Sequence, residues 1–567
     1  MGYCLYKNHV LYGEGAPGKP LDRLPEEGEI LCLFRRRPLT GRETFPVTAS
    51  AQLTAAEGPE SLTANGESVP GIPADLEEAV RQGRTRAVNA AHPRWEELLD
   101  LPRPPEKRRV HLLALGDVGS TLALGLRLLG GDVLSAIGIC DLRPNVAERW
   151  EFELNQINTP AGAGLPPVEI VDIHHIFDCD VFLFCASRFV PDTAVKTGDV
   201  RMAQYELNRE LAASYGRMAR ENHFQGLFCV VSDPVDPLCR AVLLESNKNE
   251  AGELDGQGLF PHQVRGFGLG VMNARAAYYA QKDPRFADFL TDGRTFGPHG
   301  EGLVVANSIR RYDDALSREL TEKTKHANLD MRELGYKPYV APALSSGALS
   351  LLLCLRGEWH CSSVFLDGIF MGVRNQLTEK GCEVEQLVMP DALLDRVRET
   401  MAELKMVELD VAAGDADTAI AVMREVSRWG RERGLRLWPE ECLTREALVT
   451  EEAGPESFCV GAFGGETACA FILQWQDREW WPNAPAGEAA YLHKLCVRRD
   501  FAGKNVPAKV LDYIKRECKK RGAAAIRLDT AWDEETVKNI YLRLGFEIVG
   551  RKELPNGRVM ALYEMKV

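Results

Sequence analysis

Short apolar runs alternate with helix-like patterns through the middle of the chain. From residue 106 onward, each apolar run is followed by a stretch with apolar residues at every third or fourth position. The order is "VHLLALG", "STLALGLRLLG", "AIGICD", "AERWEFELNQI", "VEIV", "DVFLFCAS", a long helix over about 200–222, and "GLFCVVSD". This alternation predicts an α/β fold with a doubly wound parallel sheet.

A second α/β pattern begins near residue 405. The predicted helix "PDALLDRVRETMAELK" ends there, "MVELDVA" predicts a new strand, and strands and helices then continue to Val567. We therefore place a domain boundary at about 405. The two α/β patterns carry different motifs, so they are not an internal repeat.

The first 105 residues are predicted to form an N-terminal accessory region. Residues 46–75 mix Pro, Gly, Ser, Thr, Ala and acidic residues without apolar periodicity, which predicts a flexible segment inside this region. The stretch "LPRPPEKRR" at 101–109 marks the break before the first α/β pattern.

Composition narrows the class of protein. A chain of 567 residues exceeds what one core organises, and its 45% hydrophobic and 26% charged residues are typical of globular domains. The net charge of -14 disfavours nucleic acid as a partner.

The cysteines and the chain's apolar runs bear on compartment and on metal. The fifteen cysteines include no C-x-x-C pair, the closest being Cys179 and Cys185, so we expect reduced thiols and no metal site. No apolar run approaches the length of a membrane span, and the N-terminus lacks a basic segment followed by an apolar one. We expect a cytoplasmic protein without a membrane partner.

A glycine-containing turn follows the first of these strands. In "VHLLALGDVGSTLALGL", Ala114, Gly116 and Gly119 stand where a G-x-G-x-x-G motif would place glycines, and the helix that follows offers amide donors to a pyrophosphate. The second strand ends in Asp141, close to the spacing at which an acid reaches the adenosine ribose. We expect NAD here, since Asp141 would repel the extra phosphate of NADP even though Arg143 could favour it. A tight turn that binds nothing is the alternative.

The order of motifs over about 106–404 resembles the lactate/malate dehydrogenase family. The segments that carry the resemblance are "DVRMAQYELN", "VVSDPVD", "GLGVMNAR" and "FGPHGEG". The resemblance implies a Rossmann domain over 106–272 and an α+β substrate domain over 273–405. It also implies small-molecule substrates and allows a homo-oligomer formed through this module.

The resemblance assigns roles to three residues. His299 would be the catalytic acid/base, Arg201 would polarise the substrate carbonyl, and Arg275 would bind the substrate carboxylate. These residue types suit hydride transfer between a 2-hydroxy acid and nicotinamide, which needs a proton carrier, a cation near the carbonyl oxygen and a planar partner for the carboxylate. Taken singly, each arginine would more often be a solvated surface group, and a histidine in a turn a satisfied structural one.

The sequence departs from the family pattern at several positions. Met272 stands where the family has the aspartate that orients the histidine, and a thioether is a poor hydrogen-bond acceptor without charge. Asp233 replaces an asparagine expected beside nicotinamide and substrate, so it is a candidate substrate-binding residue. Asp233 and Glu301 are the candidates to supply the missing charge. Pro338 and Pro342 alter the pocket lining, so the family's substrate is not inherited.

Residues from about 406 to 567 resemble the GNAT acyltransferase family. The family's acyl-CoA loop aligns with Gly503, Lys504 and Val506, although Pro507 removes one amide donor from the cradle. "IYLRLGF" resembles the family's Tyr-x-x-x-Gly-Phe ending, which makes Tyr541 the candidate acid for the departing CoA thiolate. A packed helix aromatic is the alternative for Tyr541.

Together these observations predict a fused protein. An NAD-dependent 2-hydroxy acid dehydrogenase-like module would be joined to a GNAT module that uses acetyl-CoA. Two alternatives stay open: an NAD-sensing, catalytically weakened dehydrogenase module that regulates acyl transfer, and two binding modules without turnover.

Overall fold

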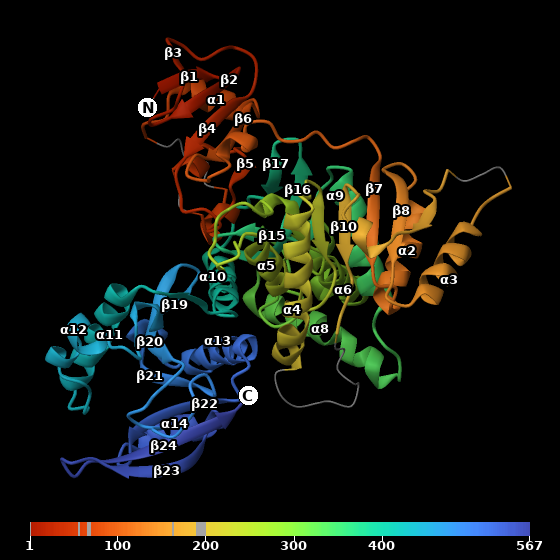
Figure 1. Cartoon of the computed structure of the whole chain (residues 1–567). Coiled ribbons are helices and arrows are strands. Elements are labelled where there is room, and N and C mark those ends of the chain that lie inside the picture. Colours follow the sequence, from red (N-terminus) through yellow and green to blue (C-terminus); the bar gives the residue numbers. More distant parts are fainter. Residues whose placement is uncertain (1, 55–56, 65–69, 161–163, 189–199) are drawn as a thin grey trace. The chain divides into compact units, whose positions relative to one another are not determined.

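The computed structural model describes residues 2–54, 57–64, 70–160, 164–188 and 200–567, with side chains of helix α4 described from residue 204 (Figure 1). Contacts divide the chain into two compact units, Met1–Leu404 and Lys405–Val567. Each unit is built around its own sheet and is described separately.

A nine-stranded sheet forms the centre of the first unit. Six strands follow the order β9-β8-β7-β10-β11-β12 and are parallel throughout. They are β7 (Arg108–Leu113), β8 (Leu134–Cys140), β9 (Val168–Ile170), β10 (Val181–Phe184), β11 (Leu227–Val230) and β12 (Val264–Gly266). This order, 3-2-1-4-5-6 in chain sequence, is that of the doubly wound dinucleotide-binding fold, so the predicted Rossmann-type sheet is confirmed.

The chain leaves β7 toward β8 and returns on the other side of β7 as β10. Such a switch point leaves a crevice at the carboxyl ends of the strands, which is where this fold binds ligands. The helices between and after the strands are α2 (Asp117–Leu129), α3 (Pro144–Asn155), α4 (Val200–Glu221), α5 (Val235–Ser246) and α6 (Leu269–Lys282).

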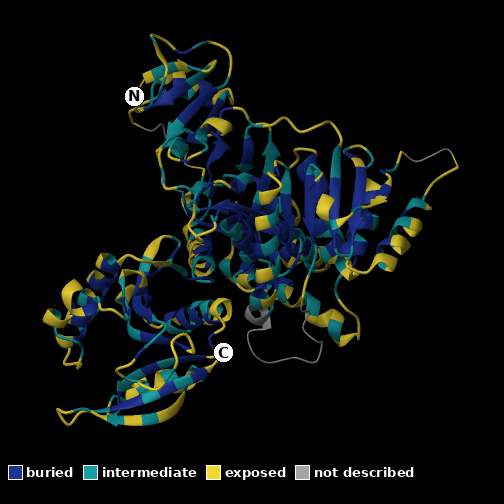
Figure 2. Cartoon of the chain, viewed as in Figure 1, coloured by how far each residue is buried: buried dark blue, intermediate teal, exposed yellow. Residues whose placement is uncertain are grey.

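The central parallel strands are buried on both faces, whereas the edge strand β9 is largely exposed. Val110, Leu112 and Leu183 are fully buried and share a core with Leu122 and Leu126 of α2. Figure 2 shows the strands as buried, whereas α3 carries exposed positions. Continuous apolar runs such as "VFLF" are therefore explained by helices on both sides of the sheet.

The sheet continues as three antiparallel strands, β15 (His360–Leu366), β16 (Ile369–Thr378) and β17 (Gly381–Val384). A small hairpin, β13 (Arg294–Phe296) and β14 (Val304–Ala306), encloses the segment "GPHGEGL". The surrounding helices are α7 (Phe289–Asp292), α8 (Asp314–Glu333), the π-helix η7 (Pro342–Leu349), α9 (Ser350–Leu355) and α10 (Asp391–Lys405). This part has the α+β composition expected of a substrate domain.

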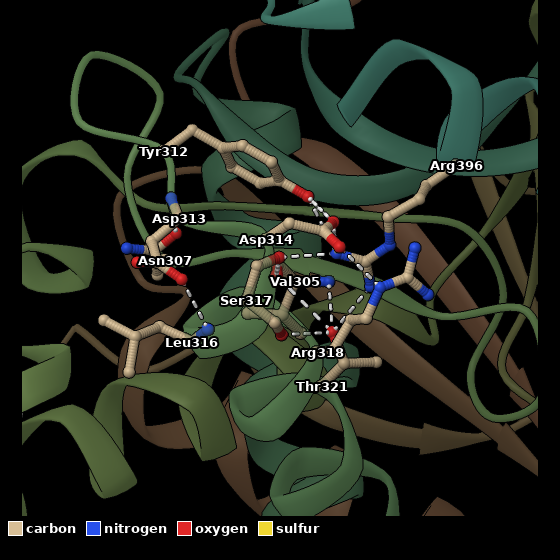
Figure 3. Close-up of polar contacts among 10 residues, drawn as sticks. All are labelled: Val305, Asn307, Tyr312, Asp313, Asp314, Leu316, Ser317, Arg318, Thr321 and Arg396. Carbon is tan, nitrogen blue, oxygen red and sulfur yellow. Dashed lines mark hydrogen bonds and ion pairs between the residues drawn. The ribbon is translucent and has the colours of Figure 1, made fainter. Parts of the chain in front are cut away.

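A buried arginine ties α10 to the start of α8 (Figure 3). The Arg396 guanidinium is 7% exposed and donates to Ser317 Oγ at 2.6 Å, Tyr312 Oη at 3.1 Å and Thr321 Oγ1 at 3.2 Å. Asp314 lies 3.9 Å away. Since a buried charge is costly unless it is hydrogen-bonded, these partners fix α10 against α8.

The N-terminal region folds as a mixed sheet in the order β3-β1-β2-β4-β6-β5. Its elements are β1 (Gly2–Tyr6), β2 (His9–Gly13), β3 (Lys19–Leu21), β4 (Ile30–Phe34), β5 (Thr44–Pro46), α1 (Ala74–Arg81) and β6 (Thr85–Asn89). Leu31 and Val88 of the central strands are fully buried and form a core with Phe260 of the dehydrogenase-like part.

The sequence predicted that segment 46–75 is flexible, but its described residues make buried contacts. Leu62 is fully buried in the core beside β15 to β17, and its backbone pairs with Leu387. Glu57 is buried between Arg42 and Arg36. Composition does not reveal these contacts, because they depend on residues outside the segment, among them Leu387, which lies more than 300 positions away.

The second unit contains a seven-stranded sheet in the order β18-β19-β20-β21-β22-β24-β23. Its strands are β18 (Asp410–Ala413), β19 (Phe458–Phe463), β20 (Glu466–Gln474), β21 (Ala489–Val497), β22 (Ala525–Ala531), β23 (Glu547–Glu553) and β24 (Val559–Lys566). The helices are α11 (Ala416–Arg431), α12 (Arg445–Leu448), α13 (Val506–Arg521) and α14 (Glu535–Arg543).

β21 and β22 are the only parallel neighbours in this sheet's described pairings, and they pair over only three residues each. The register runs from Ala489 opposite Ala525 to Tyr491 opposite Arg527, after which the two strands part. The rest of β21 therefore has unpaired backbone on its β22 side, an arrangement that leaves room for an extended ligand to bind there.

Among the described residues, no helix has the length and apolar character needed to cross a membrane.

Candidate functional site

The turn after β7 has the geometry of a dinucleotide cradle. Ala114 has φ of 74°, in the left-handed region that favours the glycine found there in the usual motif. A Cβ on Gly119 would lie 2.0 Å from the Ala114 carbonyl oxygen, so only glycine allows this close helix–strand packing. Gly116 faces open space, which leaves its backbone accessible.

Asp141 is fixed by the same turn. Its Oδ2 accepts from the Leu115 amide at 2.8 Å and its Oδ1 from the Arg143 amide at 3.0 Å, while its side chain is only 7% exposed. Oδ1 also accepts from Arg143 Nε at 3.4 Å, whereas Oδ2 retains a second lone pair for a ribose hydroxyl.

These residues fit NAD. The first amides of α2 lack intrahelical acceptors and lie beside Gly116, where they can donate to a pyrophosphate. Asp117 in this first turn would oppose a phosphate, but Lys337 Nζ lies 3.2 Å from its Oδ2 and offsets that charge.

His299 lies in the turn that joins β13 to β14. Gly297, Gly300 and Gly302 in this turn have φ of 93°, 138° and 80°, which explains the glycine-rich sequence. His299 Nδ1 lies 3.1 Å from Asp233 Oδ1 as a hydrogen bond. The imidazole is 20% exposed and the carboxylate 47%.

The carboxylate that orients His299 therefore comes from the loop after β11. The backbone oxygen of Asp233 accepts from Asn208 Nδ2 at 2.9 Å, and Asn208 is fully buried in α4. Asp236, one turn further on, is buried and accepts from Ser363 Oγ at 2.6 Å. Burial raises the pKa of Asp236 to about 6.

Met272 and Glu301 do not supply this charge. Met272 is 1% exposed in the core of α6, and its sulfur accepts from Arg275 at 3.5 Å. Glu301 pairs with Lys325 at 2.8 Å. Of the two candidate carboxylates, Asp233 is the one that contacts His299.

Arg275 is half-buried near the pair formed by His299 and Asp233. Burial lowers the pKa of its guanidinium, and the charge of Asp233 acts in the opposite direction. Within the described residues, no carboxylate forms an ion pair with Arg275. A half-buried cation without an acid partner suits an anionic ligand. The backbone of Arg201 begins α4, but its side chain lies outside the described residues.

In the second unit, a partly buried histidine, 17% exposed, lies where β21 and β22 part. His493 Nε2 is 3.2 Å from Asp477 Oδ2 and its Nδ1 is 3.5 Å from Asp529 Oδ1. Both contacts are ion pairs, and neither has the alignment of a hydrogen bond. Burial alone would lower the pKa of His493, but the two carboxylates raise it to about 9. The imidazole is therefore charged at neutral pH.

Tyr541 of α14 lies near this cluster. Its ring packs edge-on against Phe546 at 5.7 Å and tilted against Tyr563 at 6.1 Å. Burial raises the pKa of the phenol, with a further contribution from Asp529, so Tyr541 keeps its proton at neutral pH.

The predicted acyl-CoA loop precedes α13. Gly503 and Asn505 have φ of 78° and 55°, and α13 begins at Val506. Val506 is fully buried, so only its backbone amide can face a ligand. Pro507 lies in the first turn, where its missing amide breaks no intrahelical bond. Lys504 lies over the Phe501 ring, 5.1 Å from its centroid.

Sequence reasoning missed the cluster of Asp477, His493 and Asp529. The signal available was "YLHKLCV", in which a histidine and a lysine interrupt an apolar strand. Their partners are distant in the sequence, so only the fold brings them together.

A groove on this unit lies away from these residues. An open groove of about 800 Å³ runs along α11 and α12, and its lining includes none of the residues of this cluster. Two arginines of its lining form ion pairs with carboxylates: Arg428 with Glu440 at 2.8 Å, and Arg445 with Asp417 at 3.0 Å. We therefore place the candidate site at the parting strands.

Comparison with known families agrees with the topology of the second unit. Residues 422–546 match the model of the acetyltransferase (GNAT) family. The C-terminal unit carries a GNAT acetyltransferase domain. This part is also 27% identical over 143 residues to an uncharacterized N-acetyltransferase, YesJ, of Bacillus subtilis, covering 24% of the present chain and 78% of that protein.

The first unit is similar to lactate dehydrogenases. The L-lactate dehydrogenase of Treponema denticola is 28% identical over 229 residues, which cover 39% of the present chain and 65% of that enzyme. The chain thus spans just under two thirds of this relative. The resemblance to the lactate/malate dehydrogenase family and the fusion to a GNAT domain are confirmed.

Two solved structures are similar over 53% of the chain. A minor L-lactate dehydrogenase of Enterococcus mundtii has 21% identity, 98% of its chain covered and a TM-score of 0.44. The malate dehydrogenase of Archaeoglobus fulgidus in complex with NADH has 17% identity, 98% covered and a TM-score of 0.42.

Proposed function

We propose that the C-terminal unit transfers an acetyl group from acetyl-CoA to an amine. The observation that carries this proposal is the parting of β21 from β22, with a charged cluster and a protonated phenol beside it. Acetyl-CoA would supply the acyl group, and the amides that begin α13 around Val506 would hold its pyrophosphate together with Gly503 and Lys504.

Two groups of this unit would then handle protons and charge. Asp529 and Asp477 lie on two sides of the His493 imidazolium, and their carboxylates would attract a cationic amine. The ammonium would lose one proton to solvent, and the neutral amine would attack the thioester carbonyl, so that the N–C bond forms and the C–S bond breaks. Tyr541 keeps its proton at neutral pH and would give it to the departing thiolate, and the second proton of the nitrogen would restore the phenol.

Acetyl-CoA consumption by the full-length protein tests this proposal. Tyr541→Phe is expected to lower kcat about 100-fold or more with nearly unchanged acetyl-CoA affinity, because the phenol acts in the transition state. Tyr513→Phe removes a phenol from α13 outside the cluster and serves as the control. Absence of acetyl-CoA binding in the wild-type protein would overturn the proposal.

We further propose that the first unit exchanges hydride between NAD and a 2-hydroxy or 2-oxo acid. The hydrogen bond between His299 and Asp233 favours this second function, because it orients the histidine without an aspartate at position 272. NAD, when bound at Gly116, Gly119 and Asp141, would supply the hydride chemistry.

The residues of this site have separate tasks. His299 would take or return the hydroxyl proton, with Asp233 holding its ring and stabilising the imidazolium. Arg275 would bind the substrate carboxylate, and Arg201 from the start of α4 would approach the carbonyl oxygen. In this proposal Asp233 orients the histidine and lies beside the substrate.

NADH oxidation with a panel of 2-oxo acids tests the second function. His299→Gln should lower the rate at least 100-fold, whereas His326→Gln, an exposed histidine of α8, should leave it unchanged. Calorimetry should also show tighter binding of NADH than of NADPH. A wild-type protein that binds NADH but reduces none of the acids would leave a binding module.

One contact favours the alternative in which NAD binding regulates acyl transfer. Thr400 Oγ1 of α10 donates to the Gly302 carbonyl at 2.8 Å, so the helix that leads into the second unit holds the His299 turn. Acetyl transfer measured with and without NADH tests this alternative: a rate that responds to NADH supports it, and an identical rate excludes it.

A further inference from the structure

Strand β21 has a bulge beside His493. On β20 the single residue Phe471 opposes both Lys494 and Leu495, since Ala470 pairs with Cys496 and Ile472 with His493. Lys494 has φ of 48°, a left-handed conformation that a lysine rarely adopts. Bulges of this kind re-aim a side chain and occur often beside functional sites.

The bulge places Lys494 next to a tryptophan. Its Nζ lies 4.6 Å from the centroid of the Trp438 ring, and the side chain is half-buried. Within the described residues, no carboxylate forms an ion pair with this ammonium and no group accepts a hydrogen bond from it. Burial lowers the pKa of Lys494. Electrostatic interactions act in the opposite direction, and they come from Asp529, Cys496, Cys442 and Glu479.

Most other lysines stacked on aromatic rings in this unit already have a hydrogen-bonding partner. Lys538 lies 4.9 Å from the Trp532 ring and pairs with Glu535 at 2.7 Å. Lys552 lies 4.9 Å from the Trp480 ring and donates to the Glu479 backbone oxygen. Lys494 lies over the Trp438 ring, but no described group accepts a hydrogen bond from its ammonium.

Lys494 lies in the same place as the proposed acetyl-transfer residues. Asp529 and Cys496 are close enough to act electrostatically on both Lys494 and Tyr541. Its neighbour His493 has the opposite surroundings, with Asp477 and Asp529 on its two sides. On β21, therefore, a histidine paired with two carboxylates is followed directly by a lysine without an acid partner among the described residues.

We propose that Lys494 binds a carboxylate of the acetyl acceptor, so that the acceptor is a small molecule with both an amine and a carboxylate, such as an amino acid. The ammonium of the acceptor is drawn to Asp529, and its carboxylate to Lys494 over the Trp438 ring. This pairing satisfies a half-buried cation and selects against amines that lack the acid group. The inference rests on the proposed acetyltransferase function.

The test uses the full-length protein, acetyl-CoA, the common amino acids and the amines that lack their α-carboxylates. The wild-type protein should acetylate at least one amino acid with kcat/KM at least 10-fold above that of the matching amine. Lys494→Met should raise KM for the amino acid about 10-fold or more and leave KM for the matching amine unchanged. Lys494→Arg should retain most of the preference, because it keeps the charge.

Lys538→Met is the matched control, since it removes a stacked lysine outside the cluster and should change neither KM. Acetyl-CoA affinity, measured for each variant, reports whether the bulge and its surroundings are intact. Amines acetylated as well as amino acids, or a Lys494→Met variant that keeps the preference, would overturn the inference and leave the acetyltransferase function standing. A wild-type protein that does not bind acetyl-CoA would instead overturn that function.

Discussion

The two units each place a histidine beside aspartate, but in opposite environments. His299 lies in a glycine-rich turn against one carboxylate that is 47% exposed, whereas His493 lies in a strand between two carboxylates that are 5% and 14% exposed. The first arrangement keeps an imidazole free on one side to exchange a proton with a substrate. The second fixes a charged imidazole as part of the fold, since each buried group needs the others.

The comparison predicts that removal of His493 has the larger effect on stability. His493→Ala leaves Asp477 and Asp529 buried without their cation, and the expected loss is about 3–5 kcal/mol in the unfolding free energy of the C-terminal unit. Denaturant unfolding of the full-length protein, followed by tryptophan fluorescence, measures it. Lys538→Ala breaks a surface pair and should cost less than about 1 kcal/mol. Equal losses in the two variants would contradict the comparison.

The pH dependence of stability sharpens the same contrast. The pKa of His493 is raised from 6.5 to about 9 in the folded state, so its contribution is fully present below about pH 6.5 and is lost as the pH rises through 9. The difference corresponds to about 3 kcal/mol. The wild-type unit should lose stability between pH 6.5 and 9, and His493→Gln should flatten this dependence. A variant with the wild-type slope would assign the titration to another group.

Asp233→Asn tests whether the more exposed dyad is catalytic. An amide can still accept from the ring, but it carries no charge to stabilise the imidazolium, so kcat for 2-oxo acid reduction should fall about 10- to 100-fold. Stability should change little, because the carboxylate is nearly half exposed. Glu301→Gln removes a nearby carboxylate that pairs with Lys325 and should leave kcat unchanged.

Met272→Asp should have the smallest effect and should lower activity. The residue is buried against Arg275, so a carboxylate there would pair with that guanidinium and compete with the substrate carboxylate. An approximately 10-fold rise in KM for 2-oxo acids is expected, with kcat within about 2-fold of wild type. A clear rise in kcat would show that the aspartate reaches His299 instead.

Much of the fold could be predicted from the local pattern of apolar and polar residues. Alternating apolar strands and helices predicted the parallel sheet, because a strand buried on both faces must be apolar throughout. The turn at Gly116 and Gly119 and the acid at Asp141 were readable because backbone conformation, helix start and strand end are local features. The resemblance to two families rested on such local motifs.

Tertiary structure decided which side chains meet. The sequence showed Met272 where a carboxylate was expected, and only the packing of the loop after β11 against the β13–β14 turn brings Asp233 to His299. Likewise, His493 of β21 meets Asp529 because β22 is the neighbouring strand, and Asp477 reaches the same histidine from the segment between β20 and β21. Residues 57–64 are a further example of contacts that depend on packing. Leu62 is buried in the core beside β15 to β17, and its backbone pairs with Leu387, more than 300 residues later. Local periodicity specifies backbone elements, but contacts between distant side chains depend on how those elements pack.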